Sequence, residues 1–438
     1  MIRTILVVIL IIIGIVASFY GSFNALIFYL WMAYFRPESW MWNNWLAGYS
    51  LSFFVGIFLL ISAFITGVKF RFTLFAGLLL LVAVQSFLSF SMSNYRDIIF
   101  SYWIEFIKII IISYLLTILV RSEKELKITL IAISLSLGFE GAKQGWANLI
   151  LNPGGSNANM HPLLGDNNGV AVGMIMIVPI LFALYQTVER KLFKYGFLFI
   201  AIGAIYRALS TYSRGGFLTF LVMCIIYWLR SKRKGRMLLI FALFLALILP
   251  TFPQEFWDRI DTIAEGSEAS DGSAASRLYF WGLGWEMAKD NQIIGIGHRA
   301  YEAAYNTYDH TGGQYGTNRA VHSTWFGLMA EWGFPGFILF LIIYCYSLFS
   351  CARVRKICKN HPKLTSFMIY GNSIETSLIA SGVGITFLSF QYAEILWHFF
   401  ALAVICSQIL NAKMEEFVLQ NEASNEIEFT APVGWNPR

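Results

Sequence analysis

The chain has 438 residues, of which 57% are hydrophobic and 13% are charged, and its mean hydropathy is +0.61. Soluble domains usually carry about 25% charged residues, so this composition excludes an ordinary soluble protein. The formal net charge of +6 does not indicate nucleic-acid binding, because the basic residues follow a membrane pattern. The five cysteines show neither metal-site nor disulfide spacing. No glycine loop followed by Lys-Ser/Thr is present, and no cofactor is expected.

Apolar runs recur along the whole length, which predicts an all-α polytopic membrane protein with about twelve transmembrane helices. Residues 4–35 are interpreted as one crossing, either continuous or broken at Gly21-Ser22. A cleaved signal peptide ending near Ala17-Ser18 is the alternative. The predicted spans are 4–35, 46–67, 72–90, 102–120, 128–150, 168–188, 195–212, 214–229, 237–252, 323–350, 366–388 and 391–411.

Five short connections hold 18 of the 32 Lys and Arg residues, so they are placed in the cytoplasm. The segment 253–320 has ten acidic and five basic residues and is placed outside, in the periplasm of a Gram-negative cell. This parity puts both termini inside. The predicted parts are transmembrane helices at 1–120, helices with an external loop at 121–252, a periplasmic segment at 253–322, helices at 323–411 and a cytoplasmic tail at 412–438. The tail is polar and is expected to be disordered or loosely attached.

Two arginines, Arg207 and Arg214, lie near one outer membrane edge in the sequence IYRALSTYSRGGFLTF. Arginine suits an anion at the lipid headgroup level, because its planar guanidinium binds two phosphate oxygens at once. Extension of the side chains toward the headgroups is the alternative, and it is a stronger one for Arg207 than for Arg214.

The external loop 151–169 ends in Asp166, Asn167 and Asn168, just before a predicted helix. One of the three would suffice as a helix cap, and the other two indicate contacts with sugar hydroxyls. Lys143, before this loop, is a further candidate for sugar or acceptor contact, although it can also pair with Glu140. Two other pairs at helical spacing, Glu105 with Lys108 and Glu394 with His398, are interpreted as structural.

The segment 276–336 contains the best candidate for acid–base chemistry, His322, where the chain re-enters the membrane. Histidine exchanges a proton near neutral pH and can activate a hydroxyl group. From the residues alone, an interfacial histidine without a catalytic task is the alternative. The same polar stretch offers Arg277, His298, Arg299, His310 and Arg319. Its acidic residues are too dispersed to predict a metal site.

Four motifs in this order resemble the O-antigen ligase/polymerase superfamily, and especially the exosortase-associated O-glycosylation ligases. They are EGAKQG followed by GDNN (140–168), TYSRGG (211–216), SRLYFWGLGWEMAKDNQIIGIG (276–297) and HSTWFGLMAEWGFPG (322–336). The early sequence FRPESWMW (35–42) is similar to an aromatic loop of that subgroup. The resemblance covers nearly the full length.

The resemblance implies a GT-C-like glycosyltransferase of the bacterial inner membrane. Such an enzyme moves a glycan from undecaprenyl diphosphate to a hydroxyl of lipid A–core or protein, with inversion and without a metal, at the periplasmic face. Arg214 and Arg277 would hold the diphosphate, and His322 would act on the acceptor. Gly297 is followed by His-Arg-Ala-Tyr where a Gly-Phe-type continuation is expected, which leaves His298 and Arg299 without an assigned role.

Two alternative functions remain open at this point. One is a polymerase of the same superfamily, which would join repeat units on the carrier lipid. The other is a transporter or flippase for a lipid-linked glycan, which would need polar residues deep within several spans. The predicted spans are largely apolar and the polar residues gather at the outer edge, which favours an interfacial enzyme.

Overall fold

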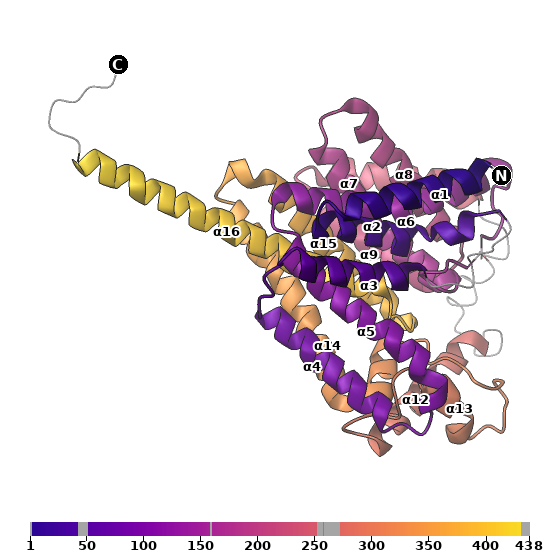
Figure 1. The fold of residues 1–438 in the computed structure, drawn as a ribbon. Helices are drawn as coiled ribbons and strands as arrows, with labels where there is room; N and C mark the ends of the chain where they lie inside the picture. The colour runs from indigo at the N-terminus through magenta and orange to yellow at the C-terminus, as the bar shows by residue number, and fades with distance from the viewer. Residues whose placement is uncertain (1, 43–50, 158–159, 252–256, 258–271, 431–438) are drawn as a thin grey trace.

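The computed structural model describes residues 2–42, 51–157, 160–251, 257 and 272–430, with the backbone alone for 272–274 and 418–430. This part of the chain is helical and contains no strand (Figure 1). Its α-helices are α1 (Ile2–Ser18), α2 (Ser22–Phe35), α3 (Leu51–Ile65), α4 (Leu74–Ser91), α5 (Arg96–Leu119), α6 (Glu123–Leu151), α7 (Asn167–Thr187), α8 (Lys191–Leu209), α9 (Arg214–Arg230), α10 (Lys234–Ile248), α12 (Gly272–Asp290), α13 (Tyr301–Tyr308), α14 (Thr324–Cys358), α15 (Thr365–Gly384) and α16 (Glu394–Thr430). Short 3₁₀ turns are η1 (Pro37–Trp40), η2 (Leu249–Thr251), η3 (Pro362–Leu364) and η4 (Ile385–Phe387).

The prediction of an all-α polytopic membrane protein is confirmed. Among the described helices, seven are long and apolar enough to cross a membrane: α4, α5, α7, α8, α10 with η2, α14 and the first part of α16. The apolar helices α1, α2 and α3 are shorter. The total of about twelve spans stays a prediction.

The first apolar stretch forms a helical hairpin, so the interpretation of residues 4–35 as one crossing is wrong. The chain turns at Gly21, which has a φ of 151°, a conformation that suits glycine. A Cβ on Gly14 of α1 would overlap the Phe28 ring of α2. The Trp42 backbone N–H donates to the Thr4 hydroxyl at 2.9 Å, so α2 returns to the level at which α1 began. The start of α1 and the end of α2 therefore lie at the same end of the bundle. Arg3 and Lys143 both lie over the Trp40 ring, so this is the end opposite the basic connections. The prediction that the N-terminus lies on the same side as those connections is therefore wrong.

The five basic connections gather at one end of the bundle, called here the basic end. Lys127 at the start of α6 donates to the Thr187 carbonyl at the end of α7, at 3.0 Å. Tyr370 of α15 reaches the Thr187 hydroxyl at 3.2 Å. Tyr114, near the end of α5, donates to the carbonyl of Arg71 between α3 and α4, at 3.1 Å. The structure thus groups the connections that the charge pattern assigns to the cytoplasm.

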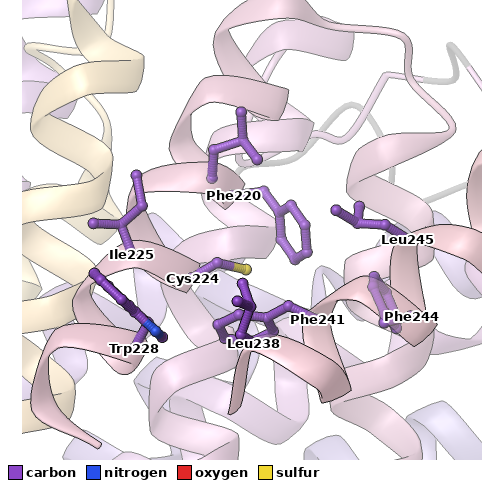
Figure 2. A pocket seen from close by; sticks show the side chains of 9 residues that line it. Phe220, Cys224, Ile225, Trp228, Leu238, Phe241, Phe244 and Leu245 are labelled. Carbon is purple, nitrogen blue, oxygen red and sulfur yellow. The ribbon is translucent and has the colours of Figure 1, made fainter. Parts of the chain in front are cut away.

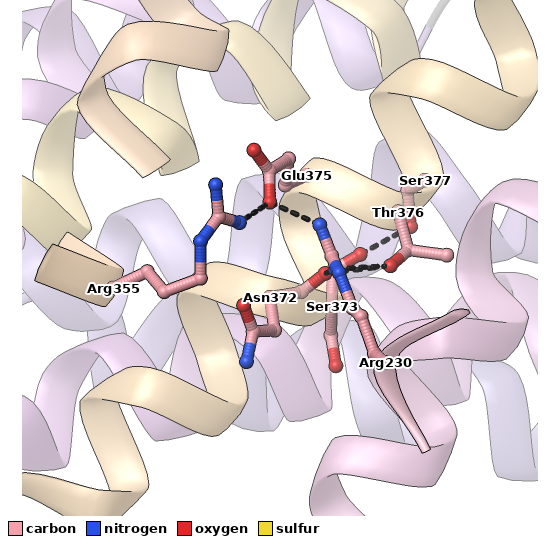
Figure 3. Close-up of polar contacts among 7 residues, drawn as sticks. All are labelled: Arg230, Arg355, Asn372, Ser373, Glu375, Thr376 and Ser377. Atoms are coloured by element: carbon pink, nitrogen blue, oxygen red, sulfur yellow. Dashed lines mark hydrogen bonds and ion pairs between the residues drawn. The ribbon is translucent and has the colours of Figure 1, made fainter. Parts of the chain in front are cut away.

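A buried carboxylate joins three helices at the basic end (Figure 3). Glu375 of α15 accepts from both Arg230 of α9 and Arg355 of α14. Arg230 also donates to the Asn372 carbonyl and the Thr376 hydroxyl, each at 2.8 Å. Because two guanidiniums share one carboxylate, this contact fixes α9, α14 and α15 relative to one another near the basic end.

α10 packs mainly against α9 and is otherwise exposed, as expected for a helix that faces lipid. The two helices enclose an apolar cavity of about 300 Å³. Phe220, Cys224, Phe241 and Phe244 are among the side chains that line it (Figure 2).

The opposite end carries α12 and α13, which form a small unit with its own core (Figure 1). Phe280 and Met287 of α12 pack with Tyr301 and Tyr305 of α13, and Ile99 of α5 belongs to the same core. The unit covers the first turns of α14 and thereby shapes the place where the chain re-enters the bundle.

α14 is broken near its start, at Gly333, where φ is 67° and ψ is −176°. The break allows the chain at 292–296 to pair with α14: the Ile296 N–H donates to the Ala330 carbonyl at 2.9 Å, and the Phe334 N–H donates to the Gln292 carbonyl at 2.8 Å. A Cβ at position 333 would lie 2.5 Å from the Gln292 oxygen. Only glycine fits both the backbone angles and this contact.

The disorder that was one of the two predictions for the polar tail is not found in residues 412–430, whereas its loose attachment stays a prediction. α16 continues as a helix to Thr430 and projects away from the bundle (Figure 1). Residues 412–430 contain many strong helix formers and neither Gly nor Pro, which favours continuation of the helix. Near the start of the tail, Lys413 forms an ion pair with Glu123 of α6 at 3.0 Å. Residues 431–438 of the predicted tail, like 43–50 and most of 252–271, lie outside the described residues.

Candidate functional site

The loop before α7 and the loop before α9 meet through the two motifs singled out in the sequence. Asp166 caps α7, because its carboxylate accepts the Gly169 N–H at 2.9 Å. The Asn168 side-chain oxygen accepts from the Ser213 hydroxyl at 2.8 Å. The Asn167 amide donates to the Thr211 carbonyl at 3.3 Å. The polar triplet therefore caps one helix and also positions the SRGG turn that begins α9.

Arg214 is the first residue of α9, directly after this turn. Ser213 caps α9 by accepting the Gly216 N–H at 3.1 Å, so the start of the helix is fixed on both sides. The Arg214 side chain is half-buried at the end opposite the basic connections. Free N–H groups at a helix start favour anions, and a guanidinium beside them strengthens that preference.

His322 lines a cavity of about 500 Å³, called here the His322 cavity. Its backbone has a φ of 50°, which is uncommon for a residue with a side chain. The indole N–H of Trp281 on α12 donates to the His322 carbonyl at 3.4 Å. Met160, Pro162 and Asp166 line the cavity on another side. The cavity thus lies between the α7 loop, the α14 entry and the connection to α16.

Charges around His322 favour its neutral form. Burial lowers the pKa of His322 below its ordinary value, and the positive charges of Arg277 and Arg319 lower it further. The negative charge of Asp166 acts in the opposite direction and is weaker than the effect of Arg277. A neutral imidazole can accept a proton from a hydroxyl group near pH 7.

Glu331 of α14 also lines the cavity, and its place in the site was not predicted. Its side chain is buried and accepts hydrogen bonds from Tyr392 at 2.7 Å, from Gln391 at 3.0 Å and from the Tyr301 N–H at 3.3 Å. These three donors hold the carboxylate in one orientation and join α13, α14 and the chain before α16. The partners are far apart in sequence, so no local pattern could have revealed them.

Asp166 and His322 line the His322 cavity, whereas six predicted site residues are not among those that line it: Lys143, Asn167, Asn168, Arg207, Arg214 and Arg277. Arg207 is buried on α8 and donates to the Asn157 carbonyl, which ties the external loop to the end of that helix. Lys143 of α6 lies 3.6 Å from Glu140 and 4.4 Å from the centre of the Trp40 ring. It lines a second cavity, described below.

The remaining polar candidates have local structural roles. His298 is fully buried and accepts from the Trp332 indole at 3.3 Å, within a group of aromatic rings. His310 is exposed and pairs with Glu286 at 3.0 Å. The Arg299 side chain lies over the Tyr102 ring, and Arg299 also lines the His322 cavity.

The two pairs interpreted as structural are present. Lys108 contacts Glu105 at 2.6 Å, and His398 lies 3.8 Å from Glu394 inside the bundle. No group of His, Cys, Asp and Glu suited to a metal ion occurs in the parts of the chain that the structure describes.

The class defined by this fold is an all-α polytopic membrane protein, and the predicted site residues gather at one end of its helices. A family model described as O-antigen ligase matches residues 197–341. The match supports the O-antigen ligase superfamily for this segment, which is less than half of the chain, and with it a membrane enzyme of the O-antigen ligase/polymerase type. The match includes Arg207, Arg214, Arg277 and His322, whereas Lys143 and the polar triplet precede it. No curated protein matches the chain.

Proposed function

We propose that this protein is an inverting, metal-independent ligase at the periplasmic face of a bacterial inner membrane. It transfers a glycan from undecaprenyl diphosphate to a hydroxyl of an acceptor, either lipid A–core or protein. The observation that carries the proposal is the grouping of the predicted residues at the end opposite the basic connections. There, Asn168 contacts the turn before Arg214, and the charges of Asp166 and Arg277 act on His322.

In the proposed reaction, His322 removes the proton of the acceptor hydroxyl while its oxygen attacks the anomeric carbon of the glycan. The bond between that carbon and the diphosphate oxygen breaks, and undecaprenyl diphosphate leaves with the bonding electrons. Arg214 and Arg277 stabilise the charge that develops on the diphosphate, a contribution that fixed cationic donors can make. Attack on the face opposite the leaving group inverts the anomeric configuration.

Arg207 has a supporting part in this proposal. Its guanidinium donates to the Asn157 carbonyl, and this contact holds the external loop against the helix that leads to the SRGG turn. Arg207 therefore positions the diphosphate-binding residues rather than serving as the first contact of the phosphates.

The test is transfer by the purified full-length protein in lipid nanodiscs, with undecaprenyl-diphosphate glycan and candidate acceptors. His322→Ala should reduce kcat by about 10²–10⁴-fold, the contribution typical of a general base. His310→Ala is the matched control, because His310 lies in the same external segment but pairs with Glu286 at the surface. It should retain the wild-type rate.

Product analysis separates the two enzymatic readings. One glycan joined to a different acceptor indicates a ligase, whereas lengthening glycans that remain on the carrier lipid indicate a polymerase. Full activity in His322→Ala would show that His322 is not the base. Loss of transfer in the presence of a chelator would refute the metal-independent mechanism.

A further inference from the structure

A second cavity, called here the Trp40 cavity, lies beside the His322 cavity and has a volume of about 270 Å³. It is built by four separate segments: the start of α1, the turn η1, the middle of α6 and the loop before α7. Met160 and Pro162 line both cavities, so the two share one wall. The residues that line the Trp40 cavity are Arg3, Phe35, Ser39, Trp40, Glu140, Lys143, Met160, His161 and Pro162.

Cationic groups dominate the polar lining. Arg3 and Lys143 line the cavity, and both lie over the Trp40 ring, at 5.7 and 4.4 Å from its centre. Glu140 is the acidic residue of the lining, and its contact with Lys143 at 3.6 Å is longer than a hydrogen bond. The Lys143 ammonium forms this ion pair and lies over the Trp40 ring, and it can also donate to a ligand because an ammonium carries three protons.

His161 adds a neutral donor to the same wall. Its Nδ1 accepts the Leu163 N–H at 3.2 Å, which leaves the ring proton of the neutral form on Nε2. Burial lowers the pKa of His161 to about 4, and the positive charges of Arg36 and Arg207 contribute to the shift. The imidazole is therefore neutral near pH 7 and can donate a hydrogen bond through Nε2.

The start of α1 is held in place at this cavity. The Trp42 N–H donates to the Thr4 hydroxyl at 2.9 Å, and the Arg3 guanidinium lies over both Trp40 and Trp42. The hairpin of α1 and α2 thus places the Arg3 guanidinium against a cavity wall made chiefly by residues 139–162. Packing of apolar helices alone does not require an arginine there.

We propose that the Trp40 cavity binds an anionic sugar of the acceptor, with carboxylate or phosphate oxygens contacting Arg3 and Lys143. The assignment to the acceptor rests on the proposed function, in which the donor diphosphate occupies the arginines near the His322 cavity. The Arg3 guanidinium, the Lys143 ammonium and the neutral His161 imidazole are all suitable donors to anionic oxygens. The volume suits about one sugar unit and is small for a whole glycan. The shared residues Met160 and Pro162 make this cavity a neighbour of the one that His322 lines.

A protection experiment tests binding without requiring transfer. Ser39 is exposed at the cavity, so Ser39→Cys, combined with Cys345→Ser, offers one accessible thiol beside four buried ones. Alkylation of this thiol in full-length protein in nanodiscs is followed by mass spectrometry. The probes are disaccharides that end in glucuronate, in glucose 6-phosphate or in glucose.

The two anionic probes should slow alkylation severalfold, and the neutral probe should not. Lys143→Gln should raise the probe concentration needed for half-protection by about tenfold, as expected when one charge-assisted contact is removed. The matched control is Lys194→Gln, because Lys194 also lies over an aromatic ring, that of Tyr185, but at the basic end. It should leave protection unchanged.

Equal protection by the neutral probe, or no protection by any probe, overturns the proposal. Protection that is unaffected by Lys143→Gln also overturns it. Its acceptor role predicts that Lys143→Gln raises KM for an anionic acceptor about tenfold with kcat maintained. If protection occurs but no transfer is found, the binding site stands and the proposed function fails; if transfer depends on His322 but protection is absent, the binding site fails.

Discussion

Two adjacent glycines in the SRGG turn should differ in their tolerance of substitution by alanine. A Cβ added to Gly216 would lie 2.3 Å from the Cβ of Ala171 on α7. A Cβ added to Gly215 would meet only ordinary contacts, the nearest being the Phe387 Cβ at 3.6 Å. We therefore expect Gly216→Ala to be damaging and Gly215→Ala to be tolerated.

The structure gives the size of the effect. Carbon atoms pack at about 3.5–4.0 Å, so α9 must move by about 1.3 Å from α7 to accept Ala at position 216. Overpacking of this kind costs about 1–3 kcal/mol. The same shift displaces Arg214 at the helix start, and a misplacement of about 1 Å in a positioning group can lower a rate by about 10²-fold. At position 215, the better helix propensity of Ala offsets any small loss.

Thermal unfolding of the solubilised full-length protein and the transfer rate measure the two effects. Gly216→Ala should lower Tm and reduce transfer by about 10²-fold, whereas Gly215→Ala should match the wild type in both. The reasoning is refuted if the two variants behave alike, or if Gly216→Ala keeps its Tm and activity. A lower Tm with unchanged transfer would show that the start of α9 does not position the reacting groups.

Two further predictions concern the electrostatics of the site and of the basic end. The pKa of His322 is lowered in the folded protein, so kcat/KM should fall only as pH drops through a value below the ordinary 6.5. Arg277→Gln removes a positive charge and should move this acidic limb to higher pH; an unmoved limb, measured at saturating donor, would separate Arg277 from the base. Glu375→Gln leaves Arg230 and Arg355 without their shared carboxylate and should destabilise the protein by about 2–4 kcal/mol. Thermal unfolding tests this, and an unchanged Tm would contradict the structural role given to that contact.

The sequence predicted what depends on strong, local signals. Apolar runs defined the class, and the basic clusters correctly grouped five connections that meet at one end of the bundle. The motif order brought Asn168 and the SRGG turn into one hypothesis, and the two side chains at that junction form a hydrogen bond. Such features are readable because charge and capping act over a few neighbouring residues.

Other features depend on contacts between distant segments and were missed or wrong. α1 and α2 have 17 and 14 residues, each shorter than the roughly 20 residues that a span needs. Together they resembled one long crossing, and the hairpin is revealed by contacts between the two helices and their ends, such as Gly14 with Phe28 and Trp42 with Thr4. The position of Glu331 depends on Tyr392, which is 61 residues away in the chain. Lys143 faces Trp40 and not the polar triplet that follows it in sequence.

The break at Gly333 divides α14 into two parts with separate attachments. The part that follows His322 is bound to the chain at 292–297, and it is also held by α4, because the Gln85 amide donates to the Trp332 carbonyl at 2.7 Å. The longer part beyond the break belongs to the helical bundle. The proposed base is therefore attached more directly to the external unit of α12 and α13 than to the longer part of α14. Because Arg277 belongs to α12, movement of that unit would carry His322 and Arg277 together and would change their position relative to Arg214 at the start of α9.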